Sequence, residues 1–434
     1  MVDYNINNKD FQFRLVKAGT KFINKVHEIP EDLKTNPQSV IMLNKGPYIL
    51  HIKTKEQQLK QNEKYFNMQM LRNKPDKKII YDSVLFTTEG ITSHAKEEIY
   101  EWLNRGYDIK ILDNNYQRKQ DPSNLLSTCY RAIDIIDDKY LTIVNQPPSR
   151  WKQTSYLKNR IGYLAFEGKI NDGWVKDINT SNMLALMTPS EYCKQCFIES
   201  GVTIPIYVIP HGVNSKFRRI PNLEKFDKFT FLWIGAPNAK RKNMEMMLKG
   251  FVKTFKDNPN VELILKINKI YDPSMNIDKE INRIVPKEMA SQVKYIDEDI
   301  TEEDLVNLFN QCHTYVSTSY SEGFGLNIIN AIACGCPTIS TTGHGADDFQ
   351  KGKVTLIDNE IVSHWAPLVP PYENTKWPKP SLDSLCKALK HHYNNYDKLS
   401  KETSAKAKNL HEEWSWIKTI DKMEEVIKEI FKVK

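Results

Sequence analysis

From residue 77 onward, short apolar runs alternate with longer segments in which apolar residues recur every three or four positions. The run KKIIYDSVLF (77–86) predicts a buried parallel strand. The segment that follows, TTEGITSHAKEEIYEWLNRG, predicts a turn and an amphipathic helix with Ile99, Trp102 and Leu103 on one stripe, ended by Gly106. The next run, YDIKILD, predicts a second strand, so the three segments form one strand–helix–strand unit.

The same alternation extends along most of the chain, with one interruption. Further strands are predicted at YLTIVNQ (140–146), MLALMT (183–188) and IPIYVIP (204–210). The stretch 210–228 is rich in proline and charge, lacks periodicity and is interpreted as a linker. Beyond it, FTFLWIG, NMEMMLKGFVKTF, VELILKIN, EEDLVNLFNQC and TYVSTS predict strand, helix, strand, helix and strand in turn. Two α/β units therefore lie in tandem, and each can form a doubly wound parallel sheet.

Two terminal regions lie outside this alternation. Residues 1–76 contain two strand-like runs, QSVIMLN and PYILHIK, and a polar segment, KEQQLKQNEKYFNMQMLRN, that predicts a helix. Residues 381–434 are charged and predict mostly helical structure.

The composition is that of a globular protein, with 434 residues, 40% hydrophobic and 26% charged, which suggests two or three domains. The net charge of +7 is too small, over this length, for a dedicated nucleic-acid binder. It favours phosphorylated ligands or an anionic membrane surface. The polar start MVDYNINNKD predicts no signal peptide, and no stretch approaches a membrane span, so we expect a cytoplasmic protein, soluble or peripheral at a membrane.

The seven cysteines are irregularly spaced and imply no disulfide framework, which indicates a reducing compartment. Cys193 and Cys196 form a C-x-x-C pair, and Cys334 and Cys336 a C-x-C pair. Zinc would need further ligands at matching spacing, and none stands out, so buried small residues are the preferred interpretation and a metal site the alternative.

Ligands of open parallel sheets bind beyond the carboxyl ends of the strands, and two loops of the second unit lie there. The first is IGAPNAKRKN (234–243), in which Gly235 allows a close turn. Arg241 and Lys242 then stand at the expected start of the next helix, an end that disfavours cations unless an anion neutralises them. This loop predicts an anion site; a solvated turn on a lysine-rich protein is the alternative.

The second loop lies in SYSEGFGLNIINAIACGCPTIST (319–341). Glu322 stands at the tip of the preceding strand, and Gly323 and Gly325 let the backbone approach a ligand. Leu326 and Asn330 lie four residues apart on one face of the predicted helix, so Glu322 and Asn330 can flank one ligand. Carboxylate and amide groups suit sugar hydroxyls. The alternative is a glycine-capped core helix with one buried asparagine.

The segment SEGFGLNIINAIACGCP resembles the donor-site signature of retaining GT-B glycosyltransferases of the family-4 type. FLWIGAPNAKRKNMEMMLKGF is similar to the basic loop of that family, and PHGVNSKF to the end of its first domain. The resemblance covers about residues 77–430 and implies two Rossmann-like, doubly wound domains facing a cleft. It implies an acceptor-side domain at 77–220, a donor domain at 221–400 and C-terminal helices at 401–434 that pack back on the first domain.

The resemblance also implies roles for individual residues. Glu322 would contact the donor sugar and support charge at the anomeric carbon. Arg241 and Lys242 would neutralise the leaving nucleoside diphosphate, the task of a metal ion in GT-A enzymes. The full predicted donor site comprises Gly235, Arg241, Lys242, Glu322, Gly323, Phe324, Gly325, Leu326 and Asn330, with no metal and no cofactor besides the nucleotide sugar.

The sequence departs from the family pattern at several positions. Asn330 replaces the second glutamate of the family's E-x7-E motif, and Ala236 replaces an arginine, so the donor contact should be weaker. Asn145 and Gln146 stand where the catalytic histidine of the first domain is expected. On the acceptor side, Gly90, His94 and Glu167 are candidates; for His94 a surface position on the helix is the preferred interpretation, and Glu167 is equally well interpreted as structural.

The N-terminal piece has a weaker resemblance of its own. FRLVKAGTKFINKVHEIPED and PYILHIKTKEQQLKQNEKYFNMQML resemble the C-terminal tail of a family-2 GT-A glycosyltransferase, with His27, Glu28 and His51 at matching positions. No Asp-x-Asp precedes them, so this piece should not catalyse alone. We therefore expect a fragment or descendant of a two-transferase fusion; an in-frame upstream coding region would support this.

These observations predict a retaining, metal-independent hexosyltransferase. It would move a sugar from a nucleotide diphosphate sugar to a glycan, lipid or protein-linked acceptor, with peripheral membrane contact and no nucleic-acid partner. The first alternative is a catalytically weak sugar-nucleotide-binding scaffold of a glycan-assembly complex. The second is a GT-B sugar-nucleotide epimerase, which would turn over the donor without an acceptor.

Overall fold

The computed structural model describes residues 2–5, 11–16, 41–43, 46–54, 77–83, 85, 90–112, 140–237, 239–268, 274–360, 364–365 and 375–432. The chain divides into two compact units. The smaller comprises Met1–Lys77 and Leu103–Asp108, and the larger comprises Lys78–Trp102 and Ile109–Lys434.

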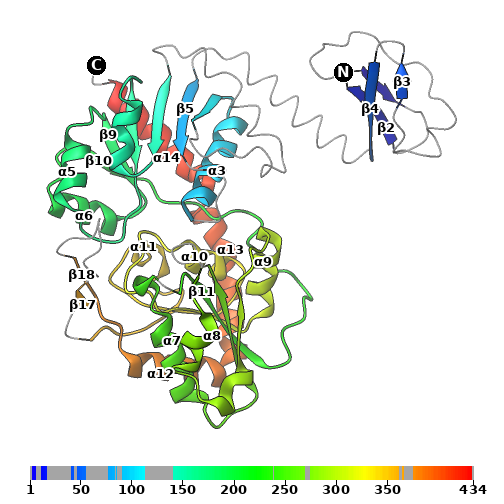
Figure 1. Cartoon of the computed structure of the whole chain (residues 1–434), viewed down its shortest axis with the longest axis vertical. Coiled ribbons are helices and arrows are strands. Elements are labelled where there is room, and N and C mark those ends of the chain that lie inside the picture. Colours follow the sequence, from blue (N-terminus) through cyan, green and yellow to red (C-terminus); the bar gives the residue numbers. More distant parts are fainter. Residues whose placement is uncertain are drawn as a thin grey trace. The chain divides into compact units, whose positions relative to one another are not determined.

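The smaller unit contains a four-stranded antiparallel sheet in the order β1-β2-β4-β3 (Figure 1). Its strands are β1 (Val2–Asn5), β2 (Phe11–Val16), β3 (Ile41–Leu43) and β4 (Gly46–Thr54). The two predicted strand-like runs correspond to β3 and β4, whereas β1 and β2 were not predicted. The predicted helix at 55–73, His27 and Glu28 lie outside the described residues.

The larger unit begins with a lobe built on a six-stranded sheet in the order β10-β9-β8-β7-β5-β6. The pairs from β5 through β10 are parallel, as predicted. The strands are β5 (Lys78–Ser83), β6 (Asp108–Leu112), β7 (Leu141–Asn145), β8 (Arg160–Tyr163), β9 (Ala185–Thr188) and β10 (Ile206–Val208). The helices are α3 (Gly90–Asn104), the 3-10 helix η3 (Pro148–Thr154), α5 (Asp172–Asn179) and α6 (Glu191–Ser200). We call this part the first lobe.

A second lobe follows the irregular stretch after β10, where the linker was predicted, and its six strands are all parallel in the order β13-β12-β11-β14-β15-β16. They are β11 (Phe229–Gly235), β12 (Val261–Ile267), β13 (Val293–Ile296), β14 (Thr314–Ser317), β15 (Thr338–Ser340) and β16 (Thr355–Leu356). Its helices are η4 (Lys240–Lys242), α7 (Met244–Phe255), α8 (Ile277–Asn282), η5 (Lys287–Gln292), α9 (Glu302–Gln311), α10 (Leu326–Ala333) and α11 (Asp347–Gln350).

Each lobe has its own apolar core, because a strand buried between helices exposes neither face to water. In β12 every residue from Val261 to Ile267 is buried, and Phe251 and Phe255 of α7 pack in the same cluster. In the first lobe, Trp151 and Phe197 pack with residues of β7 and β9. The apolar periodicity of the sequence therefore marks true buried surfaces in both lobes.

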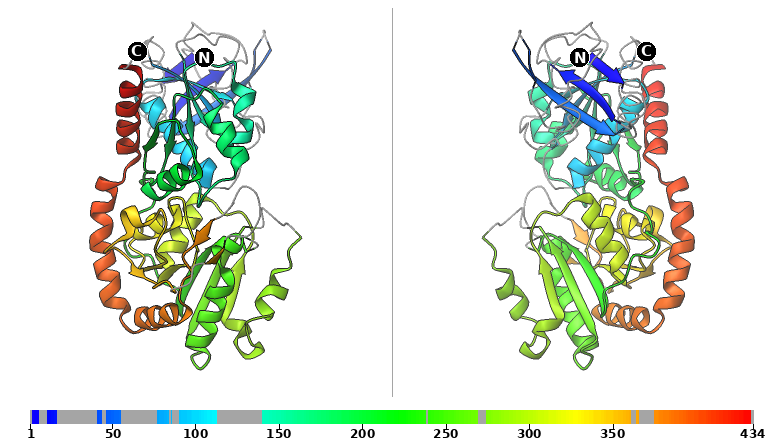
Figure 2. Two further views of the ribbon diagram at one scale, coloured as in Figure 1. Left: turned by 90° about the vertical axis from the view of Figure 1, so that its left-hand side faces the viewer. Right: turned by 90° about the vertical axis from the view of Figure 1, so that its right-hand side faces the viewer.

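The end of the chain returns from the second lobe to the first. The helices α12 (Leu382–Asn394), α13 (Tyr396–Glu413) and α14 (Trp416–Lys432) follow one another along one side of the larger unit (Figure 2). Thr419 in α14 donates a hydrogen bond to the carbonyl of Pro210 at 2.8 Å, and Val213 N–H donates to the carbonyl of Trp414 at 2.7 Å. A short antiparallel pair, β17 (His364–Trp365) and β18 (Lys376–Trp377), precedes these helices.

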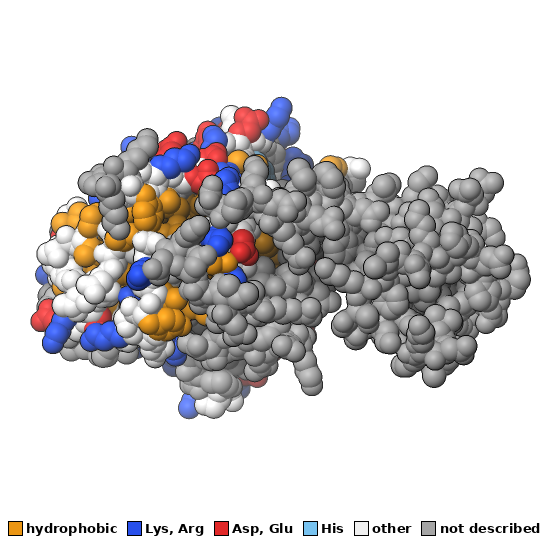
Figure 3. Space-filling view, turned by 90° about the horizontal axis from the view of Figure 1, so that it is seen from above, with side chains coloured by type: hydrophobic (Ala, Val, Ile, Leu, Met, Phe, Trp, Pro, Cys, Tyr) orange, Lys and Arg blue, Asp and Glu red, His pale blue; other side chains and the backbone are white. Residues whose placement is uncertain are grey.

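On the face shown in Figure 3, the described Lys and Arg side chains lie among Asp and Glu side chains. Within the described residues, no helix is both long enough and apolar enough to cross a bilayer.

Candidate active site

The site is built at the point where the strand order of the second lobe reverses. After β11 the chain adds β12 and β13 on one side, and β14 then pairs with the other side of β11. The register pairs Phe231 with Thr314 and Leu232 with Tyr315, so the carboxyl ends of β11 and β14 are neighbours. Ligands of open α/β sheets bind at such a reversal, where the two loops leave in opposite directions.

The basic loop after β11 differs locally from the prediction. Lys240–Lys242 form a separate 3-10 turn, Asn243 adopts a left-handed conformation with φ 55°, and α7 begins only at Met244. Arg241 and Lys242 therefore stand one turn before the helix, not at its start. The neighbouring loop fixes them there, because Tyr320 N–H donates to the carbonyl of Arg241 at 2.8 Å and Thr318 Oγ1 donates to that of Asn243 at 2.9 Å.

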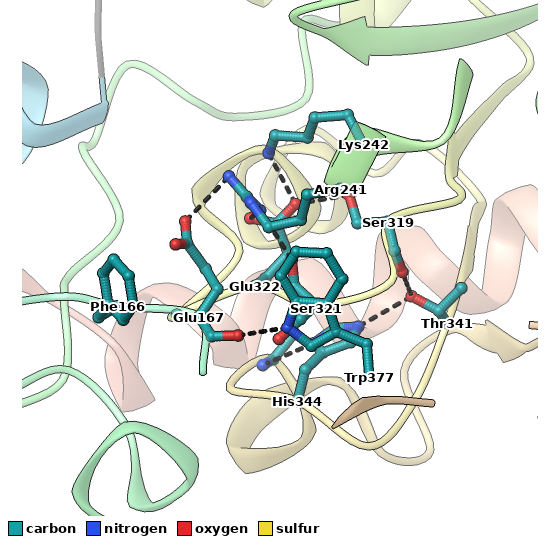
Figure 4. A network of polar contacts seen from close by, with 12 residues as sticks. Phe166, Glu167, Arg241, Lys242, Ser319, Ser321, Glu322, Thr341, His344 and Trp377 are labelled. Carbon is teal, nitrogen blue, oxygen red and sulfur yellow. Dashed lines mark hydrogen bonds and ion pairs between the residues drawn. The ribbon is translucent and has the colours of Figure 1, made fainter. Parts of the chain in front are cut away.

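Glu322 lies between the two cations (Figure 4). Its Oε1 is 2.7 Å from Nζ of Lys242, and its Oε2 is 3.0 Å from a guanidinium nitrogen of Arg241. Ser319 Oγ donates to Oε1 at 2.6 Å. The side chain of Glu322 is only 11% exposed. The two loops thus bring positive charge and a carboxylate together at adjacent strand ends, and the roles of these residues stay predictions.

Burial raises the pKa of Glu322, but the charges of Lys242 and Arg241 and the hydrogen bonds from Lys242 and Ser319 together outweigh it. The net effect holds the pKa of Glu322 below its usual value. The carboxylate is therefore ionised at neutral pH, which is the form that can stabilise a developing positive charge.

The glycine-rich loop of the second lobe contacts the first lobe. Gly325 has φ 100° at the N-terminus of α10, a conformation that favours glycine. The carbonyl of Gly323 accepts hydrogen bonds from Ser190 Oγ at 2.6 Å and from Cys193 Sγ at 3.2 Å, both at the start of α6 in the first lobe. The backbone of the predicted donor loop is thus positioned by the opposite lobe as well as by its own.

Glu167 brings the first lobe into the charged cluster. Its Oε1 lies 2.9 Å from Arg241 Nη2, and it points toward that guanidinium from the side opposite Glu322 (Figure 4). Trp377 Nε1 donates to the carbonyl of Glu167 at 2.7 Å. Arg241 is therefore shared between one carboxylate of each lobe, so that two cations and two carboxylates make a cluster with no net charge.

A cavity of about 510 Å³ opens beside this cluster. This volume suits a small-molecule ligand. Both lobes line it, and every predicted donor-site residue is among the lining residues: Gly235, Arg241, Lys242, Glu322, Gly323, Phe324, Gly325, Leu326 and Asn330. Ala236, His94 and Glu167 also line it. Of the acceptor-side candidates, Gly90 is the first residue of α3, and its surroundings lie outside what the structure describes.

The preferred interpretation of His94, a surface position on the helix, is wrong. His94 is 2% exposed, because α3 turns this residue toward β7 and the loop that precedes the second lobe. Nδ2 of Asn145, at the end of β7, lies 3.1 Å from His94 Nε2 and donates to Ser83 Oγ at 3.0 Å. β5 and β7 flank the strand-order reversal of the first sheet, so His94 and Asn145 occupy in this lobe the place that the charged loops occupy in the other.

Several lining residues escaped the sequence analysis. Lys266, at the end of β12, is 9% exposed and donates to the carbonyl of Ile267 at 2.9 Å. Asn268, Asp299 and His211 also line the cavity. A charged residue near the end of an otherwise apolar strand, as in VELILKIN, was the available signal for Lys266. For His211 the sequence held no signal besides its position in PHGVNSKF.

The cysteine pairs belong to the packing of the lobes. Cys193, Cys334 and Cys336 are buried, and Cys196 is half-buried. In the part of the chain that the structure describes, no group of three or more His, Cys, Asp or Glu residues is arranged to hold a metal ion.

Two sequence comparisons find similarity to glycosyltransferases, and one of them is located in the second lobe. Residues 216–364 match the family described as "Glycosyl transferases group 1". A probable sucrose-phosphate synthase of Thermosipho melanesiensis is 28% identical over 217 residues, which are 49% of this chain and 44% of that protein. The match thus spans less than half the length of this curated relative. Residues 216–364 therefore resemble a group 1 glycosyltransferase domain.

Solved structures agree over a longer span. The HepE protein of Anabaena, solved with UDP and glucose, is 13% identical with a TM-score of 0.59, over 81% of this chain and 100% of that one. A sucrose-phosphate synthase of Thermosynechococcus elongatus is 15% identical with a TM-score of 0.58, over 82% and 100%. A glycosyltransferase of Rickettsia africae is 14% identical with a TM-score of 0.59, over 83% and 100%. At these identities the likeness concerns the fold, and it identifies the two lobes as a GT-B fold.

Proposed function

We propose that this GT-B chain, with its group 1 domain, is a hexosyltransferase that uses a nucleotide diphosphate sugar and retains the configuration at the anomeric carbon. The acceptor would be a glycan, a lipid or a protein-linked group, and no metal ion would take part. The observation that supports this best is the contact of Glu322 with both Arg241 and Lys242 at the wall of the cavity.

The proposed chemistry follows from where charge develops. Departure of a nucleoside diphosphate places negative charge on the phosphate oxygens, and fixed cations stabilise that charge as it forms. Arg241 and Lys242 are held in place by contacts of their own backbone, so little reorganisation is needed. Glu322, kept ionised by the same cations, faces the positive charge that grows on the sugar ring. The Anabaena structure that holds UDP-glucose supports a nucleotide sugar as the donor.

The departures from the family pattern favour a second candidate, a binding subunit with weak catalysis. Asn330 lines the cavity without the charge of a glutamate, and Asn145 stands where a histidine was expected. Such a subunit would bind a nucleotide sugar without releasing the nucleoside diphosphate.

A donor panel distinguishes the two. UDP-, GDP- and ADP-linked hexoses are tested first by thermal shift, because a ligand that binds the folded chain raises Tm by mass action. The donor that binds is then tested for release of nucleoside diphosphate with and without acceptor sugars. Turnover is expected from the wild-type chain and a fall of about 100-fold or more from Glu322→Gln.

The matched control is Glu288→Gln, the same change at an exposed residue of η5, which should leave turnover unchanged. Binding without turnover in the wild-type chain would favour the binding subunit. Binding by no member of the panel would exclude both proposals. Retention is read from the anomeric configuration of the product, and metal independence from activity that persists in excess EDTA.

A further inference from the structure

His211 lies between the two lobes of the larger unit and lines the cavity. It is 3% exposed. Both of its ring nitrogens are buried, and neither has a hydrogen-bond partner among the residues that the structure describes. Its neighbours are rings: Phe324 is stacked on it at 5.0 Å between centroids, and His94 meets it edge-on at 4.4 Å.

A buried polar group without a partner destabilises the folded chain, because the hydrogen bonds that it made to water in the unfolded chain are not replaced. A phenylalanine in this aromatic surrounding would meet no such penalty. An imidazole is therefore expected here only if something else bonds to it. The cavity wall on which it lies is where a ligand can do so.

The charge state of His211 narrows the chemistry of that ligand. Burial, followed by the nearby charge of His94, lowers the pKa of His211 well below its usual value, so the ring is neutral. A neutral imidazole offers one N–H donor and one nitrogen acceptor. A hydroxyl group also donates and accepts, whereas a phosphate needs donors or positive charge, which Arg241 and Lys242 supply elsewhere in the cavity.

Hydrogen-bonding side chains of the first lobe also line the cavity beside His211. His94 and Asn145 line the cavity on the first-lobe side and are linked to each other at 3.1 Å. Phe324, which stacks on His211, is two residues from Glu322. A ligand held by the charged cluster would therefore extend its uncharged part toward His211.

We propose that His211 is a sugar-binding residue, which exchanges hydrogen bonds with a hydroxyl group of the sugar held in this cavity. The inference rests on the proposed function and deepens it, since it names the residue that distinguishes a nucleotide sugar from a bare nucleoside diphosphate. The hydroxyl belongs either to the transferred sugar or to a sugar acceptor, two sources with the same chemistry.

The test compares His211→Phe, which keeps an aromatic ring and removes both nitrogens, with the wild-type chain. Dissociation constants are measured for UDP and UDP-glucose, or for the nucleoside diphosphate and nucleotide sugar selected by the donor panel. The variant should bind the nucleotide sugar about tenfold more weakly, the effect of one lost hydrogen bond, and the nucleoside diphosphate within about twofold of wild type. Unchanged nucleoside diphosphate binding also shows that the variant is folded.

A second variant, His211→Gln, keeps one donor and one acceptor and should recover most of the lost affinity. If donor affinity is unchanged but KM for a sugar acceptor rises about tenfold, the hydroxyl is that of the acceptor. The inference is overturned if the variant binds the nucleoside diphosphate and the nucleotide sugar more weakly by the same factor. It is also overturned if neither dissociation constant changes and KM for the acceptor stays the same. Both outcomes leave the proposed function intact. Failure of the wild-type chain to bind any nucleotide sugar overturns both.

Discussion

Glu322 depends on its neighbours because its carboxylate is almost fully buried. A carboxylate removed from water is stable only when paired, and removal of one partner leaves a buried charge uncompensated. Arg241 and Lys242 provide that pairing from a distant loop, since Lys242 lies 80 residues before Glu322 in the sequence. Substitutions of these three residues therefore alter the stability of the second lobe as well as the proposed chemistry, and binding has to be measured beside activity.

Gly345 tests how tightly the glycine-rich loop is packed. A Cβ atom there would lie 2.0 Å from the carbonyl oxygen of Gly323, which is backbone and has little freedom to move. We expect Gly345→Ala to lower the free energy of unfolding by about 1–3 kcal/mol through overpacking. Urea denaturation provides the measurement.

Gly173→Ala is the control for that substitution. A Cβ atom there meets Asn171 Oδ1 at 3.3 Å, a side-chain atom, and alanine is favoured in α5. Its stability should lie within about 0.5 kcal/mol of wild type. Equal stability of the two variants would mean that the loop shifts freely to admit the methyl group.

At the scale of elements, the neighbouring ends of β11 and β14 decide where the charged cluster forms. The sequence predicted both strands and both loops, because apolar runs and glycine positions mark them. Their adjacency follows from the parallel sheet with a reversal of strand order, the usual arrangement of such units.

The side chain of Asn214 bridges α3 and α9, and from this bridge we predict how stability depends on pH. Asn214 Nδ2 donates to Glu97 in α3 at 2.6 Å and to Glu302 in α9 at 3.1 Å, and Lys216 pairs with Glu302. Burial, and then the charge of Glu302, raises the pKa of Glu97 from 4.5 to about 7. The folded chain therefore binds a proton that the unfolded chain releases, and stability falls as pH rises from about 4.5 to about 7.

Glu97→Gln isolates this contribution. At pH 5 the side chain at position 97 is neutral in the folded state of both the wild-type chain and the variant. At pH 8 the wild-type carboxylate of Glu97 is charged beside Glu302. The variant should thus gain stability relative to wild type as pH increases from 5 to 8, as measured by urea unfolding at each pH. For Glu288→Gln, at an exposed position, the difference in free energy of unfolding from wild type should not depend on pH. A pH-independent difference for Glu97→Gln as well would contradict the prediction.

At the scale of the whole molecule, α14 ties the end of the chain to the first lobe. Its residues Trp416, Ile420, Met423 and Val426 are buried, and Tyr207 of β10 donates to Glu429 at 3.0 Å. A chain that ends at Ser415 loses these four apolar side chains. We expect its free energy of unfolding to fall by on the order of 5 kcal/mol, measured by urea unfolding.

A chain that ends at Ile430 serves as the control, because it keeps all four buried side chains and Glu429. Its stability should remain near that of the full chain. If both truncations were equally stable, α14 would contribute little, and the return of the chain to the first lobe would have another cause.

Some structural features could not be predicted from the sequence. β8 was missed because RIGY is short and begins with a charged residue. Arg160 is buried there only because its guanidinium donates to the carbonyls of Ser181 and Trp151 and to Thr154. The misplaced His94 has a similar explanation, since its surroundings come from β7 and from the segment before the second lobe.

Local sequence patterns were sufficient to predict the two α/β lobes, the strand ends that hold Arg241, Lys242 and Glu322, and the glycines beside them. They were sufficient because burial periodicity and turn chemistry are local properties of the chain. Three features follow only from the tertiary structure: Glu167 shares Arg241, His94 is buried, and His211 has no hydrogen-bond partner among the described residues. Each of these depends on groups far apart in sequence, whose distance is set by the packing of one lobe against the other.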